Sequence, residues 1–382
     1  MSEGRANAVS TLFGNRGQTS VNRGIAEFHG RRPVFVAAAG ETILALPVEG
    51  LDAQRLTEFV ALCAPAATRL IVTARRAHAL GLVATTPVSL QLKPGFSADL
   101  ILALVADGKA GCACDARPAG AAAAAAIQLA KLSHGLPAVL VANIAADGAA
   151  KFEPRIIVVD AEAVSRFGDE SIRSLAIASE ASVPLNSGTR TRFVAFRDAL
   201  GVSSAAIIVG KPDLSKPVPV RLHSACLTGD VFGSRRCDCG DQLKLALARI
   251  EDLGGGIILY LAQEGRGLGL ANKMRTYRLQ EGGLDTVDAN TTLGFDDDER
   301  DYRIAARMLQ MLGCARVELL TNNPAKLEGL AKAGIEIVSR MPLEAPINAD
   351  NRRYMTAKAA RAGHQLDHLL ESLAEDAAPL AT

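Results

Sequence analysis

The sequence contains no tryptophan and only four tyrosines, and aromatic residues make up 4% of it. So few aromatic side chains argue against a base-stacking surface for single-stranded nucleic acid. The 42 Lys and Arg residues are balanced by 41 Asp and Glu, so the formal net charge of +1 gives no bulk attraction to a phosphate backbone. No apolar run reaches the roughly 18 residues of a membrane-spanning helix. We therefore expect neither nucleic acid nor a membrane as a partner.

The N-terminal stretch is polar and lacks the apolar centre of a secretory signal. The seven cysteines are an odd number, which does not suit a complete set of disulfides. Both features are typical of a reducing compartment, where clustered thiols serve metal binding or catalysis. We expect a cytoplasmic protein.

The length of 382 residues favours two domains, because single cores seldom grow beyond roughly 250–300 residues. Residues 1–25 show no periodic pattern and are predicted to be a flexible tail, as are residues 371–382. The first domain is expected at 26–175, where short apolar runs predict strands. The pattern breaks over 172–187, which we interpret as the boundary before a second domain at 180–370.

Strands and helices alternate clearly in the second domain. Residues 218–223 predict a strand that leads to Cys226, with Pro219 placing its start at a sheet edge. Apolar residues recur at helical spacing over 242–253, and a buried strand follows at 256–261. Alternation of this kind predicts an α/β fold, layered as in α+β proteins, in which helices cover the sheet faces.

Cys226, Cys237 and Cys239 form the first chemical constellation. A Cys-x-Cys pair with a third cysteine upstream can place three thiolates around one tetrahedral ion, and zinc suits sulfur ligands best. Three protein ligands leave a fourth position for water, as in catalytic zinc sites. Three buried thiols, or a structural site completed by a distant ligand, remain alternatives.

Two turns have the pattern of anion sites. Gln-Glu-Gly-Arg-Gly-Leu-Gly at 263–269 follows a buried strand, and its backbone N–H groups with Arg266 would suit phosphate. A dinucleotide site, with Asp285 or Asp288 near a ribose, is the alternative, and so is a plain tight turn. The second turn, Thr-Asn-Asn-Pro-Ala-Lys at 321–326, combines a helix start with a lysine in the first turn, where the dipole disfavours a cation.

An acidic run, Asp-Asp-Asp-Glu-Arg-Asp, occupies residues 296–301. The simpler interpretation is a solvated helix start that complements the helix dipole. The alternative is a carboxylate held beside Arg300 for proton transfer or phosphate chemistry. Together the constellations describe a metal ion, two anion sites and an acidic cluster, which indicates hydrolysis of a phosphorylated substrate such as a nucleotide.

The second half resembles GTP cyclohydrolase II from about Ser182 to His368. The likeness rests on five motifs: Arg-Leu-His-Ser-Ala-Cys-Leu-Thr-Gly-Asp at 221–230, Cys-Asp-Cys-Gly at 237–240, Gln-Glu-Gly-Arg-Gly-Leu-Gly-Leu-Ala-Asn-Lys at 263–273, Asp-Thr-Val-Asp-Ala-Asn at 285–290, and the turn at 321–326. This family opens the guanine imidazole ring at the start of riboflavin synthesis.

The resemblance implies a role for each matching residue. One zinc ion per subunit would be bound by Cys226, Cys237 and Cys239, and magnesium would accompany the triphosphate. Asp298 would accept a proton, Arg300 would be the nucleophile toward the α-phosphate, and Tyr277 would assist ring opening. The residues implied in GTP binding are Arg221, His223, Ser224, Gln242, Glu264, Gly265, Arg266, Thr286, Thr321 and Lys326. Glu264 suits the N1–H and N2–H₂ donors of guanine.

One position departs from the family pattern. The family usually has glutamate just before the first zinc cysteine, where this chain has Ala225. Losing that carboxylate would weaken magnesium or substrate binding without removing a zinc ligand. The resemblance also implies a homodimer.

The first half resembles the 3,4-dihydroxy-2-butanone-4-phosphate synthase domain often fused ahead of this enzyme, at residues 30–36 and 129–140. The family's acidic loop after the first strand is reduced here to Glu41 alone, within residues 37–44. That chemistry needs carboxylates for metal and acid-base steps, so we expect a degenerate, inactive domain with a scaffolding or oligomerising role. Cys112 and Cys114 lack further ligands nearby and are interpreted as packing residues.

The expected function is zinc-dependent hydrolysis of GTP to 2,5-diamino-6-hydroxy-4-(5-phosphoribosylamino)pyrimidine, formate and pyrophosphate. A non-catalytic regulator that binds GTP or zinc is one alternative, suggested by Ala225 and the degenerate first half. The same ring opening in another pathway is a second alternative.

Overall fold

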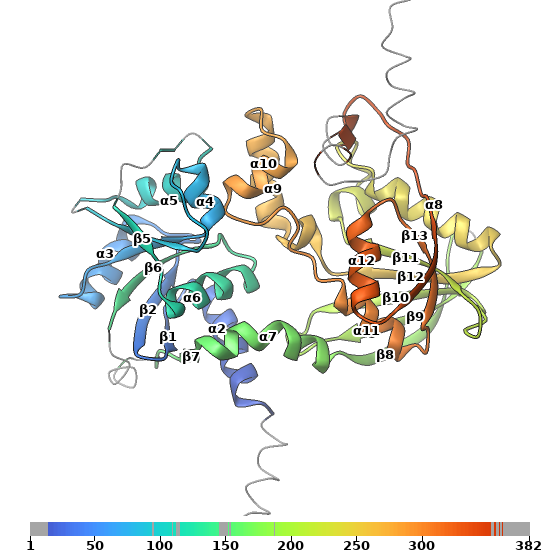
Figure 1. Ribbon diagram of the computed structural model, residues 1–382, viewed down its shortest axis with the longest axis horizontal. Helices are drawn as coiled ribbons and strands as arrows, with labels where there is room; N and C mark the ends of the chain where they lie inside the picture. The colour runs from blue at the N-terminus through green and yellow to red at the C-terminus, as the bar shows by residue number, and fades with distance from the viewer. Residues whose placement is uncertain are drawn as a thin grey trace, which may run out of the picture. The chain divides into compact units, whose positions relative to one another are not determined.

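The computed structural model describes residues 14–361, apart from 94, 109, 112–114, 145–151, 153, 187, 353, 354, 357, 358 and 360 (Figure 1). Cys112, Cys114 and the predicted C-terminal tail lie outside the described residues. The chain forms two compact units. The first contains residues 1–170 with 271–284 and 288–298, and the second contains 171–270, 285–287 and the chain from 299 onward. The α/β class predicted for both halves is confirmed.

The first unit is built on a seven-stranded sheet with the order β5-β4-β3-β6-β2-β1-β7. Neighbouring strands are antiparallel except β1 and β7, which are parallel. The central strands β6 and β2 are almost wholly buried, which explains their continuous apolar sequence. The strands are β1 (Val34–Ala38), β2 (Glu41–Pro47), β3 (Arg69–Val72), β4 (Val88–Gln91), β5 (Ala116–Pro118), β6 (Ala138–Asn143) and β7 (Val158–Asp160).

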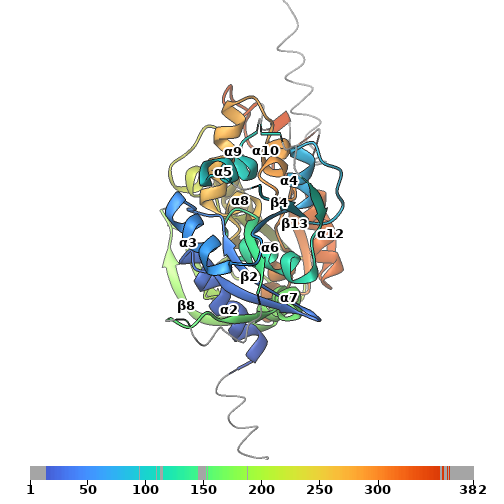
Figure 2. The ribbon, with the colours of Figure 1, turned by 90° about the vertical axis from the view of Figure 1, so that its left-hand side faces the viewer.

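Alanine-rich α6 packs directly on this sheet, where it contacts β1, β2, β3 and β6 (Figures 1 and 2). Ala122, Ala126 and Ala130 are fully buried, and their small side chains let the helix backbone come close to the strands. The other helices in this part of the chain are α2 (Arg16–His29), α3 (Ala53–Cys63), α4 (Ala74–Ala79), α5 (Ala98–Ala106), α6 (Ala121–Leu132) and α7 (Ala161–Ser174).

The predicted tail at 1–25 is wrong from residue 16 onward, because this stretch forms α2. The Asn15 side chain caps the helix by accepting from the backbone N–H of Gln18 at 3.1 Å. Val21, Ile25 and Phe28 recur at helical spacing and are buried against α6, β1 and β7. Polar residues outnumber these anchors, so the sequence pattern was too weak to reveal the helix.

Two stretches of the second half of the chain pack in the first unit: Ala271–Leu284, which contains most of α9 (Leu270–Glu281), and Asp288–Asp298, which contains most of α10 (Thr286–Thr292). Phe295 is buried there, with the Lys131 ammonium 5.9 Å from its ring centre. The packing units therefore do not follow chain order.

The second unit has its own seven-stranded sheet, ordered β14-β13-β11-β12-β10-β9-β8. Strands β14, β13, β11 and β12 run parallel, whereas β12, β10, β9 and β8 pair antiparallel. The strands are β8 (Ala176–Pro184), β9 (Arg190–Arg197), β10 (Ser203–Gly210), β11 (Val218–Ser224), β12 (Gly255–Leu261), β13 (Arg316–Leu320) and β14 (Glu336–Met341).

Two details of the second sheet correct the sequence interpretation. The break at 172–187 is largely strand β8, whose residues are all exposed, so no buried face imposes an alternating pattern. Pro219 does not mark a sheet edge, since β11 lies between β12 and β13. Pro219 is the second residue of this strand, and its carbonyl oxygen would lie 2.4 Å from a Cβ atom at Gly256.

Helices α8 (Cys239–Asp252), α11 (Arg303–Met311) and α12 (Pro324–Lys332) belong to the second unit. Because β11, β12 and β13 are parallel, their carboxyl ends share one edge of the sheet. The chain after β11 leads to the first predicted zinc cysteine, and the two predicted anion turns follow β12 and β13. Topology therefore brings three separate sequence motifs to one edge.

None of the helices within the described ranges is long and apolar enough to cross a membrane.

Replacing Phe28 by alanine is expected to destabilise the first unit by about 3–5 kcal/mol, because it removes a buried ring and leaves a cavity under α2. Phe28 is 2% exposed, whereas Phe232 is 76% exposed and makes the matched control. Urea unfolding, followed by circular dichroism, measures both variants. Equal stability of the two variants would show that α2 is not docked on the sheet.

Candidate active site

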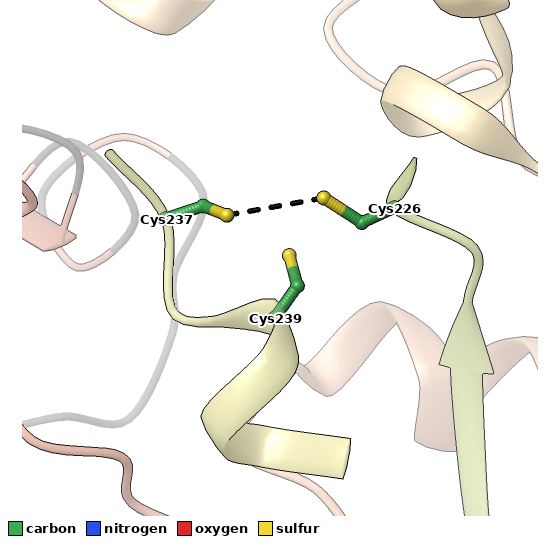
Figure 3. Close-up of side chains that lie close together, drawn as sticks. All are labelled: Cys226, Cys237 and Cys239. Carbon is green, nitrogen blue, oxygen red and sulfur yellow. Dashed lines mark hydrogen bonds between the residues drawn. The ribbon is translucent and has the colours of Figure 1, made fainter. Parts of the chain in front are cut away.

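Three cysteines converge at the edge where β11 ends. The Sγ atoms of Cys226, Cys237 and Cys239 all lie within 4.8 Å of one another, and those of Cys226 and Cys237 are 3.8 Å apart. Figure 3 shows the three side chains pointing toward a common centre. Cys226 precedes the π-helical turn η2 (Leu227–Val231), and Cys239 begins α8. The arrangement offers three sulfur ligands to one ion, as the spacing predicted.

Two glycines make this convergence sterically feasible. A Cβ atom at Gly229 would lie 2.8 Å from the Cys237 sulfur and 3.1 Å from the Cys226 sulfur. A Cβ atom at Gly240 would lie 2.4 Å from the Gly229 carbonyl oxygen. The backbone N–H of Gly229 donates to the Cys226 sulfur at 3.3 Å. The turn η2 therefore lies directly against the sulfur atoms, which only glycine permits.

The electrostatics of the cluster suit a cation. The hydrogen bond with Cys226 raises the pKa of the Cys237 thiol, and hydrogen bonds with Cys226 and Cys237, together with burial, raise that of Cys239 well above its usual value. Thiolates this close repel one another, and a divalent cation between them removes that penalty. A soft or borderline metal ion such as zinc fits this donor set.

A buried carboxylate anchors the chain at the first cysteine. Asp230 accepts hydrogen bonds from the Cys226 backbone N–H at 3.0 Å and from the Tyr260 hydroxyl at 2.9 Å. The His223 Nε2 atom lies 3.0 Å from the same carboxylate, and its ring stacks on Tyr260 with centroids 5.5 Å apart. Asp230 thereby ties the cysteine-bearing turn to strands β11 and β12.

His223 has a defined state in this network. Its side chain is 3% exposed, and burial lowers the pKa of the imidazole, which favours the neutral ring. When Nε2 donates to Asp230, Nδ1 is an unprotonated acceptor. Nδ1 has no hydrogen-bond partner among the described residues, and His223 lines the pocket beside Cys239. The histidine therefore offers an acceptor to a molecule bound there.

The pocket next to the cysteines is strongly basic. Four cations, Arg221, Arg266, Arg300 and Lys326, line it with a single carboxylate, that of Asp238. Such a cavity favours a polyanion such as a triphosphate. The remaining lining residues are His223, Ser224, Cys239, Gln242, Thr321, Asn322, Asn323 and Leu343.

Buried hydrogen bonds hold the basic groups in place. The Arg221 guanidinium donates to the Leu320 carbonyl at 2.9 Å and to the Gln242 side chain. Burial lowers its pKa to about 10, which still leaves it protonated at neutral pH. The Lys326 ammonium donates to the Leu222 carbonyl at 2.7 Å. Both cations are thus pre-positioned, so binding an anion costs little side-chain ordering.

The glycine-rich turn after β12 forms the 3-10 turn η3 (Glu264–Gly267). Arg266 has a φ of 60°, a left-handed conformation that is uncommon for a residue with a side chain. The Glu264 carboxylate accepts from the backbone N–H groups of Leu227 at 2.6 Å and of Gly265 at 3.1 Å. Glu264 therefore connects this turn to the chain that follows Cys226.

The Asn-Pro turn after β13 starts α12 as predicted. The Asn323 side chain accepts from the Ala325 N–H at 2.9 Å, and the Thr321 hydroxyl accepts from the Asn323 N–H at 3.0 Å. Asn322 exchanges two hydrogen bonds with the backbone of Leu343. Thr321 and Lys326 both line the basic pocket, where the anion-site interpretation places them.

The acidic run divides into separate roles. Asp296 forms an ion pair with Arg75 at 2.8 Å in the first unit, and Asp301 pairs with Arg303 at the start of α11. Asp301, which also accepts from the Arg303 N–H at 2.9 Å, fits the simpler interpretation of a helix-start carboxylate, whereas the long-range ion pair of Asp296 does not. The guanidinium carbon of Arg300 lies 5.5 Å from the centre of the Tyr302 ring.

The predicted site residues are divided between the two packing units. The second unit gathers the three cysteines and Arg300 with Arg221, His223, Ser224, Gln242, Arg266, Thr321 and Lys326 around the pocket. Glu264 and Gly265 lie in η3, and Thr286 lies in the short stretch 285–287 of the same unit. Tyr277 and Asp298 pack in the first unit. Their catalytic roles stay predictions.

Sequence reasoning missed the residues that support the site. Asp230, Tyr260 and Gly229 were not singled out, although Gly229 and Asp230 belong to the motif that carries the first cysteine. The signal was available in part, because an aspartate four residues after a ligand, next to a glycine, suits a tight turn. Tyr260 lies inside a buried strand and has no sequence feature that distinguishes it.

Comparison with known proteins defines the class to which this fold and site belong. A profile of the GTP cyclohydrolase II family matches residues 176–342. A GTP cyclohydrolase-2 from Azospirillum brasilense is 42% identical over 362 residues, covering 90% of this chain and 93% of the relative. One from Xylella fastidiosa (strain 9a5c) is 37% identical, covering 93% and 89%.

Two further proteins are similar over different extents. A "Riboflavin biosynthesis protein RibBA" from Bacillus mycoides is 42% identical over 256 residues, covering 64% of each chain. A crystal structure of RibBX, a two-domain 3,4-dihydroxy-2-butanone 4-phosphate synthase from A. baumannii, has 14% identity and a TM-score of 0.33, covering 85% of this chain and 99% of that chain. Because two relatives match this chain over 90% and 93% of its length, it belongs to the GTP cyclohydrolase II family of hydrolases.

Replacing Gly229 by alanine is expected to lower bound metal at least tenfold, because the new methyl group would push the Cys226 and Cys237 sulfur atoms apart. Elemental analysis of the purified protein measures zinc per chain. Gly111→Ala is the control, since a Cβ atom there meets nothing within 4 Å. Full zinc occupancy in the Gly229 variant would contradict the assignment of the ion to these three thiols.

Proposed function

We propose that the protein is a GTP cyclohydrolase II that hydrolyses GTP to 2,5-diamino-6-hydroxy-4-(5-phosphoribosylamino)pyrimidine, formate and pyrophosphate, the first step of riboflavin biosynthesis. The observation that carries the proposal is the three-thiol cluster that shares Cys239 with a pocket lined by four cations. Membership of the family, and the riboflavin biosynthesis named for a relative, support the same conclusion.

The proposed metal is one zinc ion held by Cys226, Cys237 and Cys239. A zinc ion held there would supply a Lewis acid and an activated water for hydrolysis at C8 of guanine, the carbon that is released as formate. The close packing of η2 against the sulfur atoms and the anchoring of Cys226 by Asp230 keep the thiols in ligand geometry. A non-catalytic regulator is the alternative, and the sequence features that favour it are Ala225 and the degenerate first half.

The phosphates are proposed to occupy the basic pocket. Arg221, Arg266 and Lys326 would neutralise charge on the triphosphate, with magnesium bound to its oxygens. Gln242 and Thr321 would add hydrogen bonds, and Arg300 would be the group that attacks the α-phosphate as pyrophosphate leaves. Ser224 Oγ and Arg221 Nε are buried without a hydrogen-bond partner among the described residues, which leaves both atoms available to a ligand.

Guanine recognition is proposed for Glu264. Its carboxylate accepts backbone N–H groups of Leu227 and Gly265, which hold it in a defined position in η3. A carboxylate suits the N1–H and N2–H₂ edge of guanine and would reject adenine, whose edge has a different donor pattern. Asp298 as proton acceptor, Tyr277 in ring opening and Thr286 in GTP binding complete the proposed set.

The first half is proposed to lack catalytic activity of its own. Glu41, the one carboxylate left where the related synthases have an acidic loop, accepts a hydrogen bond from the Ala122 N–H at 3.2 Å. It thus serves as a cap for α6. A cavity lined by Ala38, Gly40, Glu41, Thr42, Asn143 and Ile144 contains no second acidic residue among the residues described, so a divalent metal would lack ligands there. We further propose a cytoplasmic homodimer.

Purified protein is expected to release formate from GTP in the presence of zinc and magnesium, and Cys237→Ser is expected to abolish release because it removes a sulfur ligand. Product analysis by mass spectrometry and a coupled formate assay measure the reaction. Cys314→Ser, at a buried thiol outside the cluster, is the matched control and should keep activity. Tight binding with GTP recovered unchanged would support the regulator instead.

Ribulose 5-phosphate is expected to remain unconverted by the full-length protein, because Glu41 is engaged as a helix cap and its cavity holds no second acidic residue within the described part of the chain. Detection of 3,4-dihydroxy-2-butanone 4-phosphate by mass spectrometry is the measurement. The Glu41→Gln variant serves as the background. Turnover by the native protein above that background would show that the first half is an active synthase.

A further inference from the structure

Arg76 is one of the most deeply buried charged groups of the first unit, at 1% exposure. Its guanidinium donates to four backbone carbonyls. Three belong to α5 and its C-terminal end: Leu104 at 2.8 Å, Ala103 at 3.0 Å and Asp107 at 2.8 Å. The fourth is Thr292 at 2.7 Å, which ends α10. Arg76 therefore joins the α/β domain to a segment contributed by the other half of the chain.

Thr73 adds a second contact to the same segment. Its hydroxyl donates to the Gly294 carbonyl at 2.7 Å and accepts from the Arg76 N–H at 3.1 Å. Gly294 has a φ of 91°, and a Cβ atom there would lie 2.8 Å from the Thr73 oxygen. The backbone at 292–294 thus fits closely around Thr73 and Arg76. A residue with a side chain at position 294 would clash with Thr73.

A separate set of bonds holds α9 in the same unit. The Asn272 side chain donates to the His134 carbonyl at 2.9 Å, and Arg275 pairs with Glu49, which also accepts from the Leu136 N–H at 3.2 Å. The two sets of contacts lie on either side of 277–291 in sequence. Tyr277 follows the first set, and Asp298 follows the second.

We propose that the first half, although without chemistry of its own, is the platform that fixes the catalytic segment 271–298, with Arg76 as its principal positioning residue. This rests on the proposed function, in which Tyr277 and Asp298 take part in catalysis. Arg76 belongs to neither the pocket lining nor the cysteine cluster; it holds the backbone between α10 and Asp298. A buried guanidinium suits this task, because its planar fork satisfies carbonyls from two segments at once.

Arg76→Lys keeps the charge but replaces a fork of five N–H donors by an ammonium with three, which cannot satisfy the four carbonyls from two segments in the same geometry. We expect kcat for GTP to fall roughly 10- to 100-fold, because misplaced catalytic groups slow the chemical step. KM and zinc content should stay within about twofold, since the basic pocket and the cysteines are untouched. Hydrogen exchange in peptides covering 286–298 should rise in parallel.

Val36→Ala is the matched control. Val36 is fully buried in β1 of the same unit, so the variant loses stability. Among the described residues, none of the recorded hydrogen bonds that hold the segment 271–298 involves Val36. It should keep wild-type kcat and wild-type exchange at 286–298. If Val36→Ala slows catalysis as much as Arg76→Lys, general destabilisation explains the effect and the proposal fails.

Should Arg76→Lys not fold, the pair Thr73→Val and Thr73→Ser decides the question. The valine loses the hydroxyl bond to Gly294, whereas the serine keeps it, so kcat should fall in the first and return in the second. Increased exchange at 286–298 with unchanged kcat would overturn the platform role alone. Absence of formate from the wild-type protein would instead overturn the proposed function, and with it this extension.

Discussion

The site depends on holding three sulfur atoms close together in a setting that does not favour their charged form. Hydrogen bonding among the thiols and burial raise the pKa values of Cys237 and Cys239, so in the bare protein the cluster resists ionisation. Binding of a divalent cation favours the thiolate over the thiol, because each thiolate then neutralises part of the cation's charge. The glycine at 229 and the carboxylate of Asp230 maintain the geometry before the ion binds. The geometry of the cluster is therefore compatible with a preformed metal site.

Parallel pairing of β11, β12 and β13 brings the other residues of the pocket to the same edge of the sheet as the cysteines. Each strand delivers its following loop to the same sheet edge, so residues far apart in sequence meet there without further adjustment. Arg221 on β11 and Lys326 on α12 both donate to strand carbonyls, which fixes two cations on the rigid part of the fold. Preorganised charge of this kind stabilises a developing anion more effectively than mobile side chains do.

Much of the second unit could be predicted from sequence, because its motifs are local. The cysteine spacing, the glycine-rich turn and the Asn-Pro helix start each carry their own signal within a few residues. The first unit was less predictable. Helix α2 is anchored by a few apolar residues among polar ones, so it shows no clear period. In the second unit, strand β8 has no buried face and likewise shows no alternation. Asp230 and Tyr260 depend on contacts between separate elements, which no local pattern encodes.

The largest difference between sequence and structure concerns which segments pack together. Motif order along the chain suggests that one half carries all of the cyclohydrolase, yet 271–284 and 288–298 complete the packing of the other half. Thr73 and Arg76 bind carbonyls of this inserted segment, and those carbonyls would be left unsatisfied if the first half were lost. Losing carboxylates that serve only the chemistry of the first half would leave none of these carbonyls unsatisfied. A domain whose own reaction is no longer needed can therefore lose its acidic residues while its fold, and the contacts to the neighbouring segment, remain under constraint.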